Sequence, residues 1–166
     1  MLIESERLYV RYLVMEDLEN YYRLNGDPEI MKYIRAAKTR EETEVFLKEV
    51  IDRYGKQRID LRLALLEKHT DTFVGSFAII PLDNSNELQL GYSLLKEYWG
   101  KGYATEITKA GMVYAFNTLG LDRIAAVTEV ANTASQHVLL KSGFVFEKII
   151  TEKDKKLNVY RALKTI

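Results

Sequence analysis

The chain has 166 residues, a formal net charge of zero and no cysteine. The length favours one domain, residues 1–166, with a core of its own, and the lack of cysteine excludes disulfides, thiolate metal sites and a cysteine nucleophile. The balanced charge gives no support for a nucleic-acid partner. The longest clean apolar run, residues 77–80, is far too short to cross a bilayer. We therefore expect a cytoplasmic protein without a membrane partner.

The N-terminal part of the chain predicts one strand followed by three helices. The strand covers residues 8–12, and the first helix starts at Asp17. A short second helix starts at Pro28, because proline is favoured at the first helical position, and runs through Ile34. The third helix starts after Thr39, where the sequence Thr-Arg-Glu-Glu forms a capping box.

The middle of the chain has the two-residue period of strands. We predict strands at residues 61–66 and 73–81, joined by a polar turn at residues 68–71. Another turn, at residues 83–86, includes Asn84. The next strand alternates: Leu88, Leu90, Tyr92 and Leu94 share one face, and Glu87, Gln89, Gly91 and Ser93 share the other.

Helices and strands alternate in the last third of the chain. A long helix is predicted over residues 102–119, with Gly120 as its C-terminal stop. A strand, a shorter helix and two more strands follow, at residues 124–130, 132–142, 144–151 and 158–163. The whole pattern indicates an α+β domain built around one sheet.

A glycine-containing loop joins the alternating strand to the long helix. Its sequence is Tyr98-Trp99-Gly100-Lys101-Gly102-Tyr103-Ala104-Thr105-Glu106. Glycine lets the backbone turn tightly and approach a ligand closely, and the free N–H groups of a helix N-terminus favour a phosphate. The spacing fits neither a P-loop nor the dinucleotide-binding fingerprint. Taken alone, the loop suits an ordinary turn as well as a phosphate site.

A second motif follows the long helix. It comprises Asn132-Thr133-Ala134-Ser135 and then Leu139-Leu140-Lys141-Ser142-Gly143-Phe144. Supporting segments, in chain order, are Glu6-Arg7-Leu8, Arg11, Asp17-Leu18, Asp27-Pro28-Glu29 and Leu90-Gly91-Tyr92. With these motifs, which extend over most of its length, the chain resembles the GNAT superfamily of acyl-CoA-dependent N-acetyltransferases. Within that superfamily it is similar to the ribosomal-protein N-terminal acetyltransferases of the RimJ and RimL type.

The resemblance implies an α/β/α sandwich with about six or seven mostly antiparallel strands and about four helices. The sheet would splay open after the strand that ends near Leu95. Acetyl-CoA would lie in the opening, with its pantetheine arm along residues 92–95 and its pyrophosphate on the N–H groups of the glycine loop. The implied cofactor-binding residues are Tyr92, Leu94, Trp99, Gly100, Lys101, Gly102, Tyr103, Ala104, Thr105, Asn132, Ser135 and Lys141. Asn132 is equally suited to be a helix N-cap, and Lys141 suits a last helical turn.

The catalytic residues are less well defined by the sequence. Many relatives carry a carboxylate two residues before the Gly-Tyr of the central strand, and this chain has Gln89 there. Glu87, which shares a strand face with Gln89, is the candidate base, acting through water. Many relatives also carry a tyrosine at the position of Leu139, so Ser135 is the candidate that protonates or stabilises the leaving thiolate. The alternative is an enzyme that mainly positions its substrates and leaves proton transfer to solvent.

The function that the resemblance implies is direct transfer of an acetyl group from acetyl-CoA to a primary amine. The expected acceptor is the N-terminal amine of a protein or peptide. The alternatives are a small amine (a polyamine, an amino acid or an antibiotic) and a CoA-binding module without activity. His69 and His137 have no partner at metal-ligand spacing, so no metal is expected. Relatives often dimerise, which makes a homodimer a further expectation.

Overall fold

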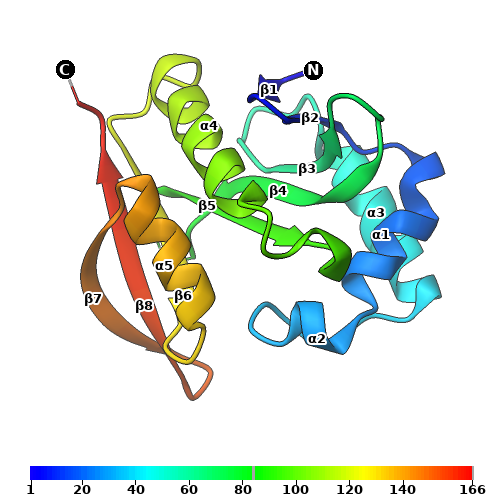
Figure 1. Ribbon diagram of the computed structural model, residues 1–166. Coiled ribbons are helices and arrows are strands. Elements are labelled where there is room, and N and C mark those ends of the chain that lie inside the picture. Colours follow the sequence, from blue (N-terminus) through cyan, green and yellow to red (C-terminus); the bar gives the residue numbers. More distant parts are fainter. Residues whose placement is uncertain (84, 166) are drawn as a thin grey trace.

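The computed structural model describes residues 1–83 and 85–165, and its strands form one eight-stranded sheet. The strands lie in the spatial order β1-β2-β3-β4-β5-β6-β8-β7 (Figure 1). Their bounds are Ile3–Glu4 (β1), Leu8–Tyr12 (β2), Leu61–Glu67 (β3), Phe73–Pro81 (β4), Leu88–Leu94 (β5), Arg123–Glu129 (β6), Val145–Glu152 (β7) and Lys155–Leu163 (β8). The helices are Leu18–Asn25 (α1), Pro28–Met31 (α2), Arg40–Arg53 (α3), Tyr103–Asn117 (α4) and Thr133–Ser142 (α5), with short 3-10 turns at Met15–Asp17 (η1) and Lys96–Tyr98 (η2).

The sheet is split between β5 and β6. All other neighbouring strands are antiparallel, whereas these two run parallel and pair only at Gln89 and Ala125. On its other side β5 pairs with β4 along its whole length, from Leu88 to Leu94. Residues 90–94 therefore have one backbone edge without a strand partner in the described chain. The predicted splayed and mostly antiparallel sheet is confirmed.

Helices cover both faces of the sheet. Alternate residues of β3 enter two separate cores: Leu63 packs in the core that includes Ile107 of α4, and Ala64 packs in the core that includes Leu24 of α1 and Leu47 of α3. Because successive strand residues point to opposite faces, α1 and α3 lie on one face and α4 on the other. The helix α5 packs beside α4, so the predicted three-layer arrangement is confirmed.

Capping hydrogen bonds within short stretches of the sequence determine where the helices α2, α3 and α5 begin. The Asp27 side chain accepts hydrogen bonds from two N–H groups at the start of α2, and Pro28 is the first helical residue. Thr39 and Glu42 form the predicted capping box of α3. The α5 helix begins after Asn132 and ends at Gly143, whose φ of 100° is left-handed.

The predicted elements are present, with a few different boundaries. The structure contains β1, which the sequence did not signal, so the sheet has eight strands where about six or seven were expected. The domain has five helices where about four were expected. The second helix ends at Met31 instead of Ile34, and β8 begins at Lys155 instead of Asn158. The turn predicted around Asn84 involves a residue outside the described part of the chain.

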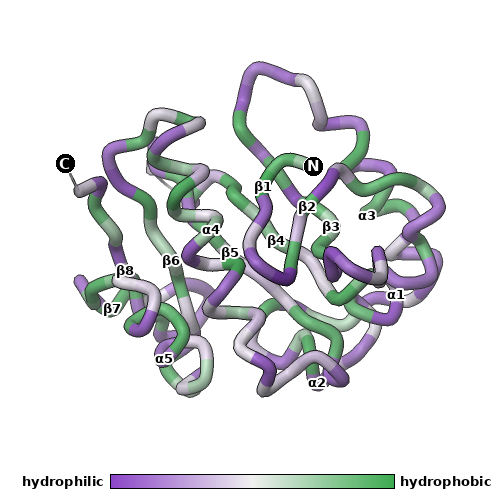
Figure 2. Tube along the Cα trace, turned by 45° about the horizontal axis from the view of Figure 1, so that its top comes forward, coloured by the Kyte–Doolittle hydropathy of each residue, from purple (hydrophilic) through white to green (hydrophobic). Residues whose placement is uncertain are grey.

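The hydropathy of the chain follows this architecture. In Figure 2, hydrophobic stretches run along the central strands, and several connecting loops are hydrophilic. Among the described residues, no helix combines the length and the apolar character needed to span a bilayer.

Candidate functional site

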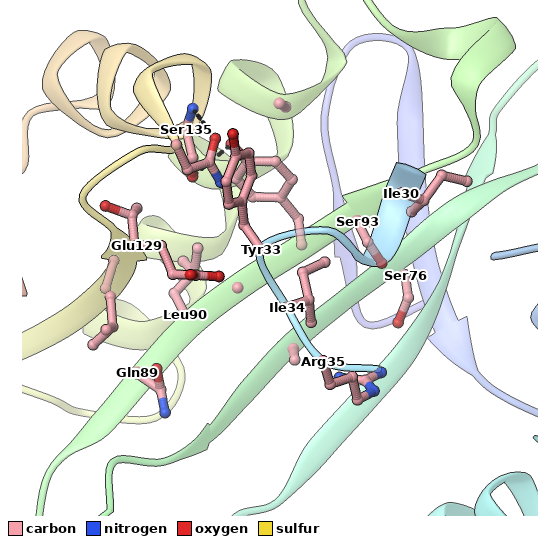
Figure 3. Close-up of a pocket in the computed structure, with 18 of the residues that line it drawn as sticks. Ile30, Tyr33, Ile34, Arg35, Ser76, Gln89, Leu90, Ser93, Glu129 and Ser135 are labelled. Atoms are coloured by element: carbon pink, nitrogen blue, oxygen red, sulfur yellow. Dashed lines mark hydrogen bonds between the residues drawn. The ribbon is translucent and has the colours of Figure 1, made fainter. Parts of the chain in front are cut away.

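A cavity of about 780 Å³ lies where β5 and β6 diverge. On the α4 and α5 face, its lining includes Tyr92, Asn132 and Ser135; on the opposite face, it includes Arg35 and Gly91. Because lining residues come from both faces, the cavity passes through the gap between the two strands (Figure 3). Two ligands that enter from opposite faces can meet inside it.

Tyr92 and Ser135 face each other on the α5 side of the opening. The Tyr92 hydroxyl, from β5, lies 3.3 Å from the Oγ of Ser135, from α5. Burial raises the pKa of Tyr92, and the hydrogen bond to Ser135 offsets this only in part. The phenol therefore stays protonated at neutral pH and can donate a hydrogen bond. The pair presents two hydroxyl groups to a ligand in the split.

Asn132 is held at the start of α5. Its side-chain oxygen accepts a hydrogen bond from the N–H of Ser135 at 3.2 Å, and the residue also lines the cavity. Asn132 is thus confirmed as the N-cap of α5, and the same bond ties it to the backbone of Ser135.

The glycine loop presents free N–H groups. Gly100 and Gly102 both have left-handed backbones, with φ of 75° and 80°, and Gly102 is the N-cap residue of α4. None of the backbone N–H groups of residues 100–105 donates to an acceptor within the described residues, and the first bond of the helix is from Glu106 N–H to the Gly102 carbonyl. Such a helix start fits a pyrophosphate.

A network from the N-terminal strands anchors this helix start. The Arg7 guanidinium forms an ion pair with Glu106 at 2.7 Å, and the Arg7 N–H and Ser5 hydroxyl also donate to that carboxylate at 2.7 Å. Burial raises the pKa of Glu106, but the hydrogen bonds from Ser5 and Arg7 outweigh it and hold the pKa below its usual range. The Glu-Arg-Leu segment of the sequence therefore fixes the first turn of α4.

Tyr103 and Trp99 position the glycine loop from either side. The Tyr103 hydroxyl donates to Glu67 at 2.5 Å, and this bond together with burial raises the pKa of Tyr103 to about 12. The Trp99 indole N–H donates to the Leu94 carbonyl at 2.9 Å. Both side chains thus hold the loop against β3 and β5.

The structure brings most of the predicted cofactor-binding residues to one place. Those that line the cavity are Tyr92, Leu94, Trp99, Gly100, Ala104, Asn132 and Ser135. Lys101, Gly102, Tyr103 and Thr105 belong to the adjoining loop and first helical turn, outside the cavity wall. The Lys101 ammonium lies 5.2 Å from the Tyr98 ring centroid. Lys141 is exposed in the last turn of α5 and does not line the cavity.

Glu87 is not positioned as the sequence suggested. Its carboxylate is held by Arg123 at 3.2 Å and by Arg161 at 2.8 Å, and it does not line the cavity. The register is the cause: Gln89 pairs with Ala125 in parallel, which places Glu87 level with Arg123. Because the carboxylate contacts these two arginines and lies outside the cavity wall, the structure gives no support to Glu87 as the base.

Gln89 and Leu139 also have ordinary structural roles. The Gln89 side chain donates to the Pro81 carbonyl at 3.3 Å, and Leu139 is buried in the core under α4 and α5. His69 and His137 are exposed. Within residues 1–83 and 85–165, no group of histidine and carboxylate side chains could hold a metal ion.

Several cavity residues were not singled out from the sequence. Glu129, at the end of β6, lies across the cavity from Ile34 and Arg35, which belong to the segment between α2 and α3 (Figure 3). Arg62 of β3 also lines the cavity. These positions belong to no local motif, since only the register of the strands and the path of the α2–α3 segment bring them together.

Comparisons with known proteins agree with this geometry. The sequence profile of the acetyltransferase (GNAT) domain matches residues 7–145. A relative from Bacillus subtilis, named "Putative ribosomal N-acetyltransferase YdaF", is 27% identical over 149 residues, which are 86% of this chain and 80% of the relative.

Two solved structures share the fold along nearly the whole chain. A GNAT-family acetyltransferase from Bacillus anthracis has a TM-score of 0.85 and 26% identity, covering 98% of each chain. Spermidine N-acetyltransferase from Vibrio cholerae, solved in complex with CoA and spermine, has a TM-score of 0.79 and 21% identity, covering 94% of this chain and 95% of that one.

Proposed function

The chain belongs to the GNAT acetyltransferase family, whose members take the acetyl group from acetyl-CoA, and we propose that this protein transfers it to the N-terminal amine of a protein or peptide. The observation that carries this proposal is the cavity that joins the two faces of the sheet between β5 and β6. It lets a thioester on the α5 side meet an amine from the α2 side. One domain, residues 1–166, supplies both sides in this proposal.

The residues present fit acetyl-CoA. The free N–H groups of residues 100–105 would bind the pyrophosphate, and the unpaired edge of β5 at residues 90–94 would bind the pantetheine amides. Asn132 and Ser135 would contact the end of that arm. The open space above Gly100, where an added Cβ would meet no atom within 4 Å, leaves room for the phosphates.

The reaction joins the amine nitrogen to the thioester carbonyl carbon and breaks the bond between that carbon and sulfur. The amine must give up a proton, and the sulfur leaves as a thiolate that must be stabilised or protonated. We assign the first role to Glu129, acting through water, because it lines the cavity and its side chain is only 19% exposed. We assign the second to the hydroxyls of Tyr92 and Ser135.

The peptide acceptor rests on the likeness to YdaF and on the family branch that the motifs resemble. The small-amine alternative is supported by the shared fold with a spermidine N-acetyltransferase. A binding module without activity is the third possibility, motivated by Gln89 and Leu139 at positions where relatives carry catalytic groups. The homodimer and the cytoplasmic location stay predictions.

Release of free CoA thiol, measured with a panel of peptides and small amines, tests the proposal. Glu129→Gln should lower kcat/KM at least tenfold at neutral pH with the KM for acetyl-CoA unchanged, and the exposed Glu49→Gln on α3 should not. Thiol release with small amines but not with peptides would show that the acceptor is a small amine. CoA binding without turnover of any acceptor would favour the binding module.

A further inference from the structure

Two arginines line the acceptor side of the cavity close to each other. Arg35 comes from the segment between α2 and α3, and Arg62 comes from β3. Their guanidinium carbons lie 5.1 Å and 5.5 Å from the centroid of the Phe46 ring, and the Lys38 ammonium lies 5.0 Å from it. Three cations therefore surround one aromatic ring, and two of them face the cavity.

Neither arginine has an ionic partner within the described part of the chain. Across residues 1–83 and 85–165, no ion pair joins Arg35 or Arg62 to a carboxylate. Two of the carboxylates that line the cavity are engaged elsewhere, Glu29 with Lys96 at 3.1 Å and Glu129 with Lys155 at 3.6 Å.

The two guanidiniums are also short of hydrogen-bond partners. Arg35 donates to the Asn25 side chain at 2.8 Å, but the Nε atoms of both arginines are buried without a partner in the described chain. Burial lowers the pKa of Arg35, and the positive charge of Arg62 lowers it further. Partly buried cations of this kind are stabilised by a bound anion, to which guanidinium donates in a planar, bidentate way.

The floor beside the arginines is open. Arg62 pairs with Ala78 in β4, and Ala78 pairs with Gly91 in β5, so the three residues form one row across the sheet on the same face. A Cβ added at Gly91 would meet no atom within 4 Å. Ser76 pairs with Ser93 in the neighbouring row, and both line the cavity together with Arg35 (Figure 3). The small side chains leave space for a ligand between the arginines and the split.

We propose that the acceptor carries a carboxylate close to its reactive amine, and that Arg35 and Arg62 bind this carboxylate while the amine reaches the gap between β5 and β6. The proposal rests on the proposed acetyl transfer and narrows its substrate class. The carboxylate can be an acidic side chain next to the N-terminus of a peptide or the α-carboxylate of an amino acid. A polyamine, which has no anionic group and several positive charges, is repelled by the same pair.

The test compares matched acceptors that differ in one charge. Thiol release is followed with the peptide amides Ser-Asp-Ala-Gly and Ser-Asn-Ala-Gly, with serine and serinamide, and with spermidine. We expect kcat/KM for at least one acidic member to exceed that of its neutral partner tenfold or more. Preference within the peptide pair identifies the side chain as the source of the carboxylate, and preference for serine over serinamide identifies the α-carboxylate. Equal rates within both pairs, or a higher kcat/KM for spermidine, would overturn the proposal.

Variants then ask whether the arginines carry the preference. Arg62→Gln should reduce the ratio of kcat/KM between the acidic and the neutral acceptor below threefold, by raising the KM for the acidic acceptor while the KM for acetyl-CoA stays unchanged. Arg35→Gln serves the same purpose if the first variant does not fold. Arg58→Gln is the matched control, because Arg58 is exposed and lies outside the cavity wall. An unchanged preference in a folded Arg62→Gln or Arg35→Gln variant would refute the assignment.

A binding measurement separates this inference from the proposed function. If the wild type binds CoA but turns over none of the acceptors, the transfer proposal fails. Calorimetric titration of the two peptides, and of serine and serinamide, into the CoA complex then decides the inference alone. Tighter binding of the acidic member of either pair that is lost in Arg62→Gln supports it, and equal binding within both pairs contradicts it.

Discussion

Replacing Gly102 by valine should abolish CoA binding while the fold persists. Gly102 has a φ of 80°, and the atom nearest to a Cβ added there is the Arg7 guanidinium nitrogen at 3.4 Å. An L-residue in this left-handed region costs about 1–2 kcal/mol, which for a chain of this length lowers Tm by about 2–8 °C. The fold tolerates such a change because the rest of the surrounding space is open.

The effect on CoA should be much larger. We expect the valine methyls to enter the space that a phosphate needs beside the free N–H groups of residues 100–105. Each hydrogen bond to a charged phosphate oxygen contributes about 1.5–3 kcal/mol. Loss of two such bonds weakens binding by at least about 3 kcal/mol, or more than about 100-fold in Kd.

Gly120 provides a matched control for the backbone strain. It lies beyond the other end of α4, has a φ of 70° and has no atom within 4 Å of an added Cβ. Gly120→Val should therefore lower Tm by a similar amount and leave the Kd for CoA unchanged, as measured by calorimetry and thermal unfolding. If Gly102→Val bound CoA within threefold of Gly120→Val, the glycine loop would not be the pyrophosphate site.

Two further variants test the thiolate site and the anchor of α4. Tyr92→Phe removes the hydroxyl that faces Ser135, so kcat should fall about 100-fold with little change in the KM for acetyl-CoA; an unchanged kcat in steady-state kinetics would remove Tyr92 from the mechanism. Glu106 has a folded pKa below its unfolded value of about 4.3, so it stabilises the fold above that pH and loses this contribution as the pH falls through the folded pKa. In thermal unfolding between pH 7 and pH 3, Glu106→Gln should be less stable than the wild type at pH 7, and the difference should shrink below about pH 4; a pH-independent difference would argue against the Arg7 and Ser5 network.

Elements with strong local signals could be predicted from the sequence. The alternation of Leu88, Leu90 and Tyr92 located β5, and the capping box at Thr39 located α3. The second helix was predicted too long because Tyr33 and Ile34 continue its apolar pattern. In the structure these two side chains line the cavity instead, so their hydrophobicity serves a binding surface and not a helix.

Boundaries that depend on pairing could not be predicted in the same way. The last two strands were predicted at residues 144–151 and 158–163, but of the residues between them only Lys153 and Asp154 have positive φ, of 48° and 65°. The flanking residues Glu152 and Lys155 pair with each other and lengthen both strands. Because an exposed hairpin needs no apolar signal, the antiparallel partner sets where β8 begins.

The residues of the site also fall into those with a local sequence signal and those whose surroundings depend on strand pairing. The glycine loop and the Asn132 cap are local, and the sequence located both. Glu87 was misplaced because its surroundings depend on Arg123 of β6 and Arg161 of β8, which become its neighbours only through strand register. Arg35 and Arg62 had no distinguishing local pattern for the same reason. The anion site proposed for them depends on the strand position of Arg62 and on the path of the α2–α3 segment, which bring the two side chains to the same part of the cavity wall.

The lack of a carboxylate at position 89 of β5 and the pair of arginines both favour the same kind of acceptor. Gln89 cannot take a proton at neutral pH, and the Glu87 carboxylate is engaged by Arg123 and Arg161. At pH 7.4, about a quarter of the molecules of an α-amine with a pKa near 7.8 are already neutral, compared with about 0.1% for an alkyl amine with a pKa near 10.4. A site that has no carboxylate on β5 and relies on Glu129 acting through water therefore suits the α-amine of a peptide better than a polyamine, whose extra charges the arginines also oppose. The arginine pair at one end of the cavity and the indirect removal of the amine proton at the other both favour an acceptor with an α-amine and a nearby carboxylate.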